Sequence, residues 1–441
     1  MNSSLNLKWL ILVAVSVGVV LALFNQASLW RLAIGPLYFD RPLFEGEHLH
    51  PFLDMKGRLA AMQAYAIGLD IYNEPNPIDP LRRISTKPSY PLHLGKLGLT
   101  LDHVFVLGTA TVVAFLGLTL ALLKPERKRE VLYGIVLMCS PPVLLGVERA
   151  NDDLVLYSLL FAIPFILRWE RVWVGFVCAV LIMLLTPVKY YPFALLVLFF
   201  YGRLPLRAVL AFCAMGVFWL AVYLWISWEE IAFLKDRMPD PVSIFAVGSK
   251  IVFQLLGLDG ALALVLRVAL ILAVIGGSIW MLFRPTPERV LVASTKERYF
   301  LFGSSIFSFC FILAGNWGYR MIYLLPCIPF LWEVNRRESS DAFRTGACQG
   351  ILILIPLIFF LERVTLGVAP GQLTGGVPGE YLVAMAVLKQ TAAWVVFAFL
   401  AWLSADVLTP SFWRLFDEAK AWVAFTRRND PEQPESSLGL K

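Results

Sequence analysis

The chain has 441 residues, of which 59% are hydrophobic and 16% are charged. This composition excludes an ordinary soluble domain, in which roughly a quarter of the residues are charged. The formal net charge is +6, but the basic residues gather in short segments between apolar stretches, so we expect no nucleic-acid partner. The chain is predicted to be an all-α polytopic membrane protein that is embedded in a lipid bilayer.

Apolar stretches that could cross a bilayer recur from one end of the chain to the other. A helix needs roughly 20 apolar residues to span the hydrocarbon layer, and we expect about twelve such helices, several of them short. The expected spans are residues 8–24, 101–123, 131–147, 154–167, 172–186, 188–201, 208–226, 261–283, 299–314, 321–334, 346–361 and 380–406. The first has no convincing cleavage site, which predicts an uncleaved anchor. We expect one transmembrane domain over residues 1–409 and a cytoplasmic tail over residues 410–441.

Basic residues occur at every second connection between these spans. They lie in residues 124–130, 168–171, 201–207, 284–298 and 335–344. Lys and Arg in short connections stay on the cytoplasmic side of a membrane. We therefore expect both termini in the cytoplasm and a multi-pass protein of the cell (inner) membrane.

The first outer segment, residues 25–100, is a large extracytoplasmic loop in this arrangement. Residues 50–72 predict a helix within it, with Asp54 at the N-terminal cap and Gly68 at the end. Residues 73–97 are basic and rich in proline, so they cannot form one regular helix. We expect the loop to carry short helices, to cross the outer surface and to form part of the active site.

Cysteine and histidine residues give no clear metal or disulfide pattern. The six cysteines lie in or at the ends of expected helices, and none forms a Cys-x-x-Cys pair, so we expect neither a disulfide framework nor a zinc site. The segment "EGEHLH" (45–50) could hold a metal, although His and Glu side chains in a loop are more often solvated. We expect no metal and no cofactor, and a metal at residues 45–50 stays the minority alternative.

A group of polar residues separates two apolar runs at "GVERANDDLVLY" (146–157). It contains Glu148, Arg149, Asn151, Asp152 and Asp153, on the outer side by the expected alternation. The simplest interpretation is structural, because Asn and Asp side chains cap helices and favour their positive ends. We accept this interpretation for Asp152.

Other outer residues also have simple structural interpretations. Asp54 could pair with Arg58 one helical turn later. Lys189 and Arg320 could reach lipid phosphates from helix ends. Unrelated caps and surface cations would be scattered over both sides of the membrane, whereas these residues share the outer side.

One carboxylate together with several cations suits the transfer of a group from a phosphate. A phosphate leaves without help from a general acid, but its developing charge needs fixed cations. The attacking hydroxyl needs one general base. Hydrolysis of a glycoside uses two carboxylates instead.

Four motifs of the outer segments add a more specific signal. The first loop contains D-x(n)-G-x-D-I-Y, formed by Asp54, Gly68, Asp70, Ile71 and Tyr72. The others are "ERANDDL", "PVKYYPFALL" and "GNWGYRMIYLLPCIPFL". In this order, the chain from about residue 8 to residue 334 resembles glycosyltransferase family 87, of the GT-C fold. It departs from the family's E-R-G-N-x-D-L turn in having Ala150 for the usual glycine.

The resemblance implies a membrane glycosyltransferase, a hexosyltransferase of the GT-C class, with a polyprenyl-phosphate-linked sugar as donor. The sugar would be a hexose or pentose, most simply a mannose-like one, and the acceptor a hydroxyl of a glycolipid or polysaccharide at the extracytoplasmic face. Asp54 corresponds to the family's catalytic base. The positions that correspond to substrate-binding residues are Glu148, Arg149, Asn151, Asp153, Lys189, Tyr191, Tyr319 and Arg320.

Two other functions stay open from the residues alone. A transporter or flippase for a lipid-linked sugar would also bind phosphate through cations, and Arg267 and Lys389 inside expected helices favour it. Transporters often contain inverted repeats, and no internal repeat is evident here. The other possibility is a non-catalytic partner in envelope assembly.

Overall fold

The computed structural model describes residues 3–26, 29, 33, 51–86, 88–237, 246–258, 260–284, 294–313, 316–337, 341–366 and 379–428. The α-helices are α1 (Ser3–Asn25), α3 (Leu53–Ala66), α4 (Ser89–Leu92), α5 (Val104–Leu122), α6 (Lys128–Met138), α7 (Pro141–Arg149), α8 (Asp152–Leu160), α9 (Ala162–Ile166), α10 (Val172–Leu185), α11 (Leu206–Ile226), α12 (Trp228–Arg237), α13 (Ile251–Leu255), α14 (Gly260–Phe283), α15 (Thr295–Leu313), α16 (Ile328–Arg336), α17 (Ala342–Leu366) and α18 (Gly379–Arg428). The 3-10 helices are η2 (His93–Leu97), η3 (Leu101–His103), η4 (Leu167–Trp169), η5 (Tyr191–Phe200) and η6 (Gly318–Cys327). Two short strands, β1 (Ala246–Val247) and β2 (Asn316–Trp317), pair antiparallel.

Six helical segments of the described chain are long and apolar enough to cross a membrane. They are Leu7–Asn25, Leu101–Leu122, Leu206–Ile226, Gly260–Phe283, Ala342–Glu362 and Glu380–Phe425. The pair α6 and α7, bent by 48°, would add a seventh if it crosses as one span. These segments confirm an all-helical, multi-pass membrane protein, while the count of about twelve spans stays a prediction.

Proline divides some of the apolar runs that the sequence predicts as single spans. Residues 131–147 break after Met138, because Pro141 and Pro142 lack the N–H groups that would continue the helix, and α7 starts with them. Residues 191–200 form a 3-10 helix that has Pro192 in its first turn. Pro410, in contrast, lies inside α18, so no helix break marks the domain boundary expected at residue 409.

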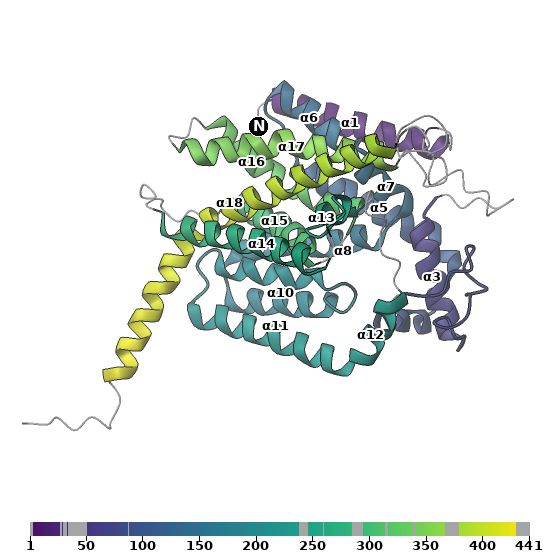
Figure 1. The fold of residues 1–441 in the computed structure, drawn as a ribbon, viewed down its shortest axis with the longest axis horizontal. Coiled ribbons are helices and arrows are strands. Elements are labelled where there is room, and N and C mark those ends of the chain that lie inside the picture. Colours follow the sequence, from purple (N-terminus) through teal and green to yellow (C-terminus); the bar gives the residue numbers. More distant parts are fainter. Residues whose placement is uncertain are drawn as a thin grey trace, which may run out of the picture.

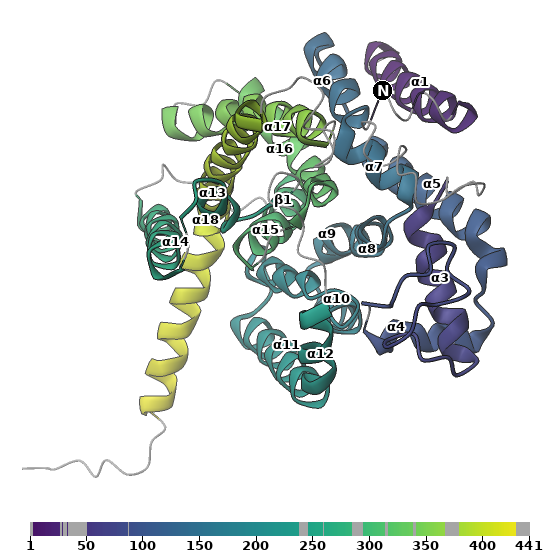
Figure 2. The same ribbon diagram turned by 45° about the vertical axis from the view of Figure 1, so that its right-hand side comes forward.

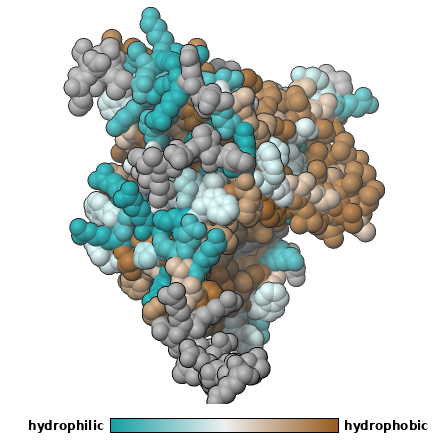
Figure 3. Space-filling model, turned by 90° about the vertical axis from the view of Figure 1, so that its left-hand side faces the viewer, coloured by the Kyte–Doolittle hydropathy of each residue, from teal (hydrophilic) through white to brown (hydrophobic). Residues whose placement is uncertain are grey.

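The long helices run side by side, and the first outer loop lies at one end of them. Figure 1 shows α3 beyond one end of α10, α11 and α14, and the C-terminal part of α18 extending from the other end. Figure 2 shows α14 next to α18 at the edge of the bundle and α8 near its centre. In the space-filling view of Figure 3, a broad hydrophobic area lies beside a band of hydrophilic residues, which is the pattern of a surface that contacts lipid.

Polar contacts join the basic segments to one another. They are Arg336 with Glu130, Arg284 with Asp341, Arg298 with Glu170 and Tyr201 with Glu297. Segments separated by up to about two hundred residues of sequence are therefore brought to the same side, as the alternation of Lys and Arg predicts. The assignment of this side to the cytoplasm stays a prediction.

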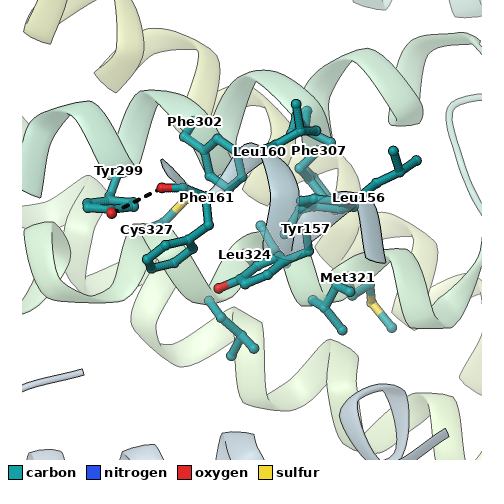
Figure 4. Packing of buried hydrophobic residues seen from close by; sticks show 14 of the residues in the cluster. Leu156, Tyr157, Leu160, Phe161, Tyr299, Phe302, Phe307, Met321, Leu324 and Cys327 are labelled. Carbon is teal, nitrogen blue, oxygen red and sulfur yellow. Dashed lines mark hydrogen bonds between the residues drawn. The ribbon is translucent and has the colours of Figure 1, made fainter. Parts of the chain in front are cut away.

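An aromatic core packs α8 against α15 and η6. Tyr157, Phe161 and Phe302 are part of it (Figure 4), and the rings of Tyr157 and Phe302 lie 6.1 Å apart between centroids. Tyr299 donates a hydrogen bond of 3.1 Å to the carbonyl oxygen of Phe161. The Tyr157 ring also lies 5.7 Å from that of Tyr323 in η6. Because Asp153 lies one helical turn before Tyr157, this core holds the start of α8 against η6.

Candidate active site

A tight turn between α7 and α8 forms the centre of the site. Ala150 ends α7 with a φ of 44°, in the left-handed region, which favours glycine. Asn151 then caps α8, and its side-chain oxygen accepts a hydrogen bond of 2.8 Å from the Asp153 N–H. Only Ala150 and Asn151 separate the two helices, so the charged side chains on either side of the turn stay close together.

Asp54 meets this turn from the first outer loop. It lies in the first turn of α3, which starts at Leu53, so it is one residue inside the helix and is not the N-terminal cap that the sequence suggests. Its carboxylate accepts hydrogen bonds from Arg149 Nη1, at 3.0 Å, and from the side-chain amide of Asn151. The Phe52 N–H donates to the Glu148 carbonyl oxygen at 2.7 Å, which fixes the start of α3 against the end of α7.

Arg58 does not pair with Asp54, so the i,i+4 ion pair considered from the sequence is wrong. Its guanidinium group instead binds the Asp152 carboxylate, with Nε 3.0 Å from Oδ1. Asp152 is therefore more than a helix cap, because it anchors α3 to α8 through a pair whose side chains are 7% and 10% exposed. The geometry explains why Asp54 and Arg58 have different partners. The Asp54 side chain is turned toward residues 149–151, and the Arg58 side chain toward Asp152.

Asp153 lies at the centre of a second group of charged side chains. Its side chain is fully buried, and its carboxylate accepts from Lys189 Nζ at 2.7 Å and from the Tyr191 hydroxyl at 2.6 Å. Arg320 Nε lies 3.8 Å from the same carboxylate. Burial raises the pKa of the Asp153 carboxyl group, but the charges of Lys189 and Arg320 outweigh burial and hold the pKa below its usual range. One buried negative charge is thus shared by two cations.

Residues on η6 complete this group. Arg320 Nη1 donates to the side-chain oxygen of Asn316 in β2, which holds the guanidinium group near Asp153. Tyr319 precedes Arg320. Its hydroxyl group is close enough to both groups of charged side chains to interact with them electrostatically. These charges belong to Asp153, Asp54, Arg320 and Arg149.

The structure brings all of the predicted site residues together from separate parts of the chain. The side chains of four charged members keep some exposure: Asp54 15%, Arg149 17%, Lys189 15% and Arg320 18%. Glu148, Asn151, Asp153 and Tyr191 are buried. The arrangement therefore offers one carboxylate and three cations to a ligand, around a buried support.

Sequence reasoning missed three supporting features. The Tyr323 hydroxyl lies 3.1 Å from the Asp153 carbonyl oxygen and 2.8 Å from the Tyr191 hydroxyl, and its single hydrogen can bond either oxygen. The available signal was its spacing of three residues from Arg320. Asn316 was visible as the first residue of the N-x-x-Y-R motif. The third is the buried ion pair of Glu362 with Lys389.

Glu362 and Lys389 form an ion pair of 2.8 Å with side chains 1% and 0% exposed. A Cβ atom on Gly318 would lie 1.9 Å from Glu362 Oε1, so this pair packs directly against the start of η6. Two charges in apolar runs were the signal in the sequence, but only the fold shows that they are partners. The pair supports the segment that carries Arg320.

Within the described residues, no group of three or more His, Cys, Asp or Glu side chains is placed to hold a metal ion. The segment 45–50, the minority metal candidate, lies outside the described residues. The six cysteines are free thiols.

Comparison with known proteins gives one match. Residues 84–302 match the model of glycosyltransferase family 87. No curated protein and no solved structure matches the chain. The matched region includes Arg149, Asp153 and Lys189, whereas Asp54 and Arg320 lie outside it and reach the site through the fold.

Proposed function

The chain belongs to glycosyltransferase family 87, whose model it matches over residues 84–302, and we propose that it transfers a sugar from a polyprenyl-phosphate-linked donor to an acceptor hydroxyl. It is a membrane glycosyltransferase by this membership and by its apolar helices. The donor class, the position of the phosphate and the base are the parts that we propose.

The observation that carries the proposal is that Lys189 and Arg320 share one buried carboxylate. Asp153 balances only one of the two positive charges. The remaining charge, on side chains that are 15% and 18% exposed, suits one anionic group of a ligand. A sugar linked to a lipid through a phosphodiester carries one negative charge at that position. Fixed cations of this kind stabilise the charge that develops on a leaving phosphate.

Arg149 extends the cationic surface toward Asp54. Because its Nη1 lies 3.0 Å from Asp54 Oδ1, Arg149 can contact the donor and orient the Asp54 carboxylate at the same time. We place the phosphate between Arg149, Lys189 and Arg320, and the anomeric carbon of the sugar on the side of Asp54.

The proposed reaction is one displacement at the anomeric carbon. The acceptor oxygen forms a bond to this carbon while the bond from the carbon to the phosphate oxygen breaks. The bonding electron pair leaves with the phosphate, and Asp54 takes the proton of the acceptor hydroxyl. The products are a glycosylated acceptor and polyprenyl phosphate, so the step balances without a further reactant.

The finer identity of the substrates follows the resemblance. A mannose-like hexose, or a pentose, is proposed as the sugar, and a glycolipid or polysaccharide of the cell envelope as the acceptor. We propose that the site lies at the end of the molecule away from the joined basic segments, which contact one another through ion pairs. If that basic end is cytoplasmic, as the positive-inside rule predicts, the reaction occurs at the extracytoplasmic face.

The transporter alternative loses one of its supports in the fold. Lys389 lies inside a predicted span, but it is fully buried against Glu362 and packs behind η6. This packing gives Lys389 a structural role in supporting η6.

A transfer assay with purified protein in lipid nanodiscs tests the proposal. Polyprenyl phosphate carrying a radiolabelled sugar is supplied with extracted envelope lipid or polysaccharide, and a nucleotide-linked form of the same sugar serves as the comparison. We expect label to enter the acceptor only from the polyprenyl-linked donor. Transfer from the nucleotide-linked sugar alone would contradict the donor class, and movement of intact lipid across the bilayer without transfer would favour the transporter.

A further inference from the structure

A second cation-lined cavity lies apart from the candidate active site, between α13 and α14. It has a volume of about 190 Å³. Lys250, Gln254 and Arg267 supply its polar groups, and Phe253, Ala263 and Leu264 supply apolar walls. None of these residues belongs to the proposed catalytic group, and none is explained by it.

The surface that carries this cavity is apolar and exposed, as a surface in contact with lipid would be. In α14, Val274 and Met281 are the buried residues, whereas Leu262, Leu264 and Val265 are 57%, 57% and 62% exposed. Figure 2 shows α14 at the edge of the bundle, with α18 on one side of it. A ligand in the cavity can therefore have an apolar chain that lies along α14.

Arg267 is an unusual residue for such a helix. An ionisable residue inside a membrane span is costly and marks a functional position by default. Arg267 is the eighth residue of α14, about 10 Å along the axis from the first one, so it lies in the first third of this helix of 24 residues. Its Nε donates to Ser249 Oγ at 2.8 Å, and its Nη2 donates to the Ile312 carbonyl oxygen. These bonds hold the guanidinium group at the cavity wall.

The charge of the segment suits a single anion. Residues 248–267 contain two cations, Lys250 and Arg267, and one acid, Asp259. Gly260, the first residue of α14, also lines the cavity, and the N-terminal end of a helix of 24 residues favours negative charge. Arg and Lys are the side chains that bind phosphate through charge-assisted hydrogen bonds.

We propose that this cavity binds the phosphate group of a membrane lipid, with the lipid chain along the exposed face of α14. The lipid can come from two sources, an anionic phospholipid of the bilayer or a polyprenyl phosphate. Both present a phosphate attached to a long apolar chain. The site is independent of the transferase reaction, so its test uses binding and not activity.

Photoreactive lipids test the proposal on the full chain in phosphatidylcholine nanodiscs. One probe is a phosphatidylglycerol and the other a polyprenyl phosphate, each with a benzophenone near the head group, and cross-linked peptides are identified by mass spectrometry. We expect labelling of residues 250–267 in the wild-type protein, reduced about tenfold or more in Arg267→Gln and in Lys250→Gln, because each variant loses a charge-assisted bond to phosphate. Competition between the unlabelled lipids shows which source is preferred.

Two further variants separate the effect of the cavity from the effect of a cation elsewhere on the surface. Ala263→Phe fills the cavity without removing a charge, and it should also reduce labelling. Lys235→Gln removes an exposed cation from α12 and should leave labelling unchanged. The proposal would be overturned if residues 250–267 were not labelled in the wild type. It would also be overturned if labelling persisted in Arg267→Gln, Lys250→Gln and Ala263→Phe.

Discussion

Arg58 lies one helical turn after Asp54, yet its guanidinium group binds Asp152 of α8, with Nε 3.0 Å from Oδ1. Because Arg58 binds Asp152, the Asp54 carboxylate is available for another role. An Asp54 carboxylate held by Arg58 would only stabilise its own helix, whereas the observed carboxylate lies beside Arg149 and Asn151. The ion pair that anchors the first loop is therefore separate from the carboxylate that we assign to catalysis.

Breaking the anchor should destabilise the protein. In Arg58→Met, Asp152 loses its partner in a site where it is 10% exposed, and the loss of one member of a buried pair costs about 3–5 kcal/mol. A double variant, Arg58→Met with Asp152→Leu, removes both charges and should recover most of the lost stability. Thermal unfolding in detergent measures this, and an Arg58→Met protein as stable as wild type would show that the pair does not anchor α3.

Ala150→Gly should stabilise the protein. Ala150 has a φ of 44°, and a left-handed conformation costs an L-residue roughly 1–2 kcal/mol. Glycine removes this strain but has a more flexible unfolded chain, so we expect a net gain of up to about 1 kcal/mol. Ala60→Gly, in the middle of α3, is the control and should destabilise. A loss of stability in Ala150→Gly would mean that its methyl contacts outweigh the backbone strain.

The cations around Asp153 should govern turnover. Removing one charge-assisted bond to a leaving phosphate costs about 2–4 kcal/mol of transition-state stabilisation, or about 30- to 1,000-fold in rate. We expect losses of this size in Lys189→Gln and in Arg320→Gln, with normal expression, and little change in Lys235→Gln. Rates near wild type in both site variants would assign these cations to lipid head groups or to structure.

The orientation in the membrane can be tested at exposed positions. Glu74 lies in the first outer loop, and Arg129 lies in the basic segment at the start of α6; both are exposed. Single cysteines at these positions, in a background without the six native cysteines, should react with an impermeant reagent from opposite sides. We expect the cysteine at residue 74 to react from outside. Reaction of both from outside would overturn the assignment of the faces.

The Lys and Arg pattern predicts the sidedness of the chain from each connection by itself, and this sidedness stays a prediction. Contacts between distant side chains are harder to predict from the sequence. The partner of Asp54 could not be found in the same way, since Arg149 is 95 residues away in sequence and Arg58 is the nearest cation. Glu362 and Lys389 show the same limit: each is visible as a charge in an apolar run, but their pairing and their contact with Gly318 depend on how α17 and α18 pack.

Span prediction is limited for a different reason. Hydropathy measures length and apolar content, and it is blind to the hydrogen bonds that proline removes. The break before Pro141 therefore appears as an uninterrupted apolar run in the sequence. The 3-10 geometry that starts at Tyr191 does not change hydropathy either. Both irregular elements border the site, where they position Glu148, Arg149 and Tyr191.

The assignment of Asp54 as the base that activates the acceptor hydroxyl is the central claim. Asp54→Asn keeps the size of the side chain but removes its charge and its basicity. Glu148→Gln is the matched comparison, because Glu148 is the competing carboxylate and is 1% exposed. The measurement is the single-turnover rate of sugar transfer from the polyprenyl-phosphate donor, with donor binding measured in parallel. We expect Asp54→Asn to bind donor and to transfer sugar about 100-fold more slowly or worse, with a smaller effect in Glu148→Gln. A normal rate in Asp54→Asn together with loss of transfer in Glu148→Gln would contradict the account and move the base to Glu148.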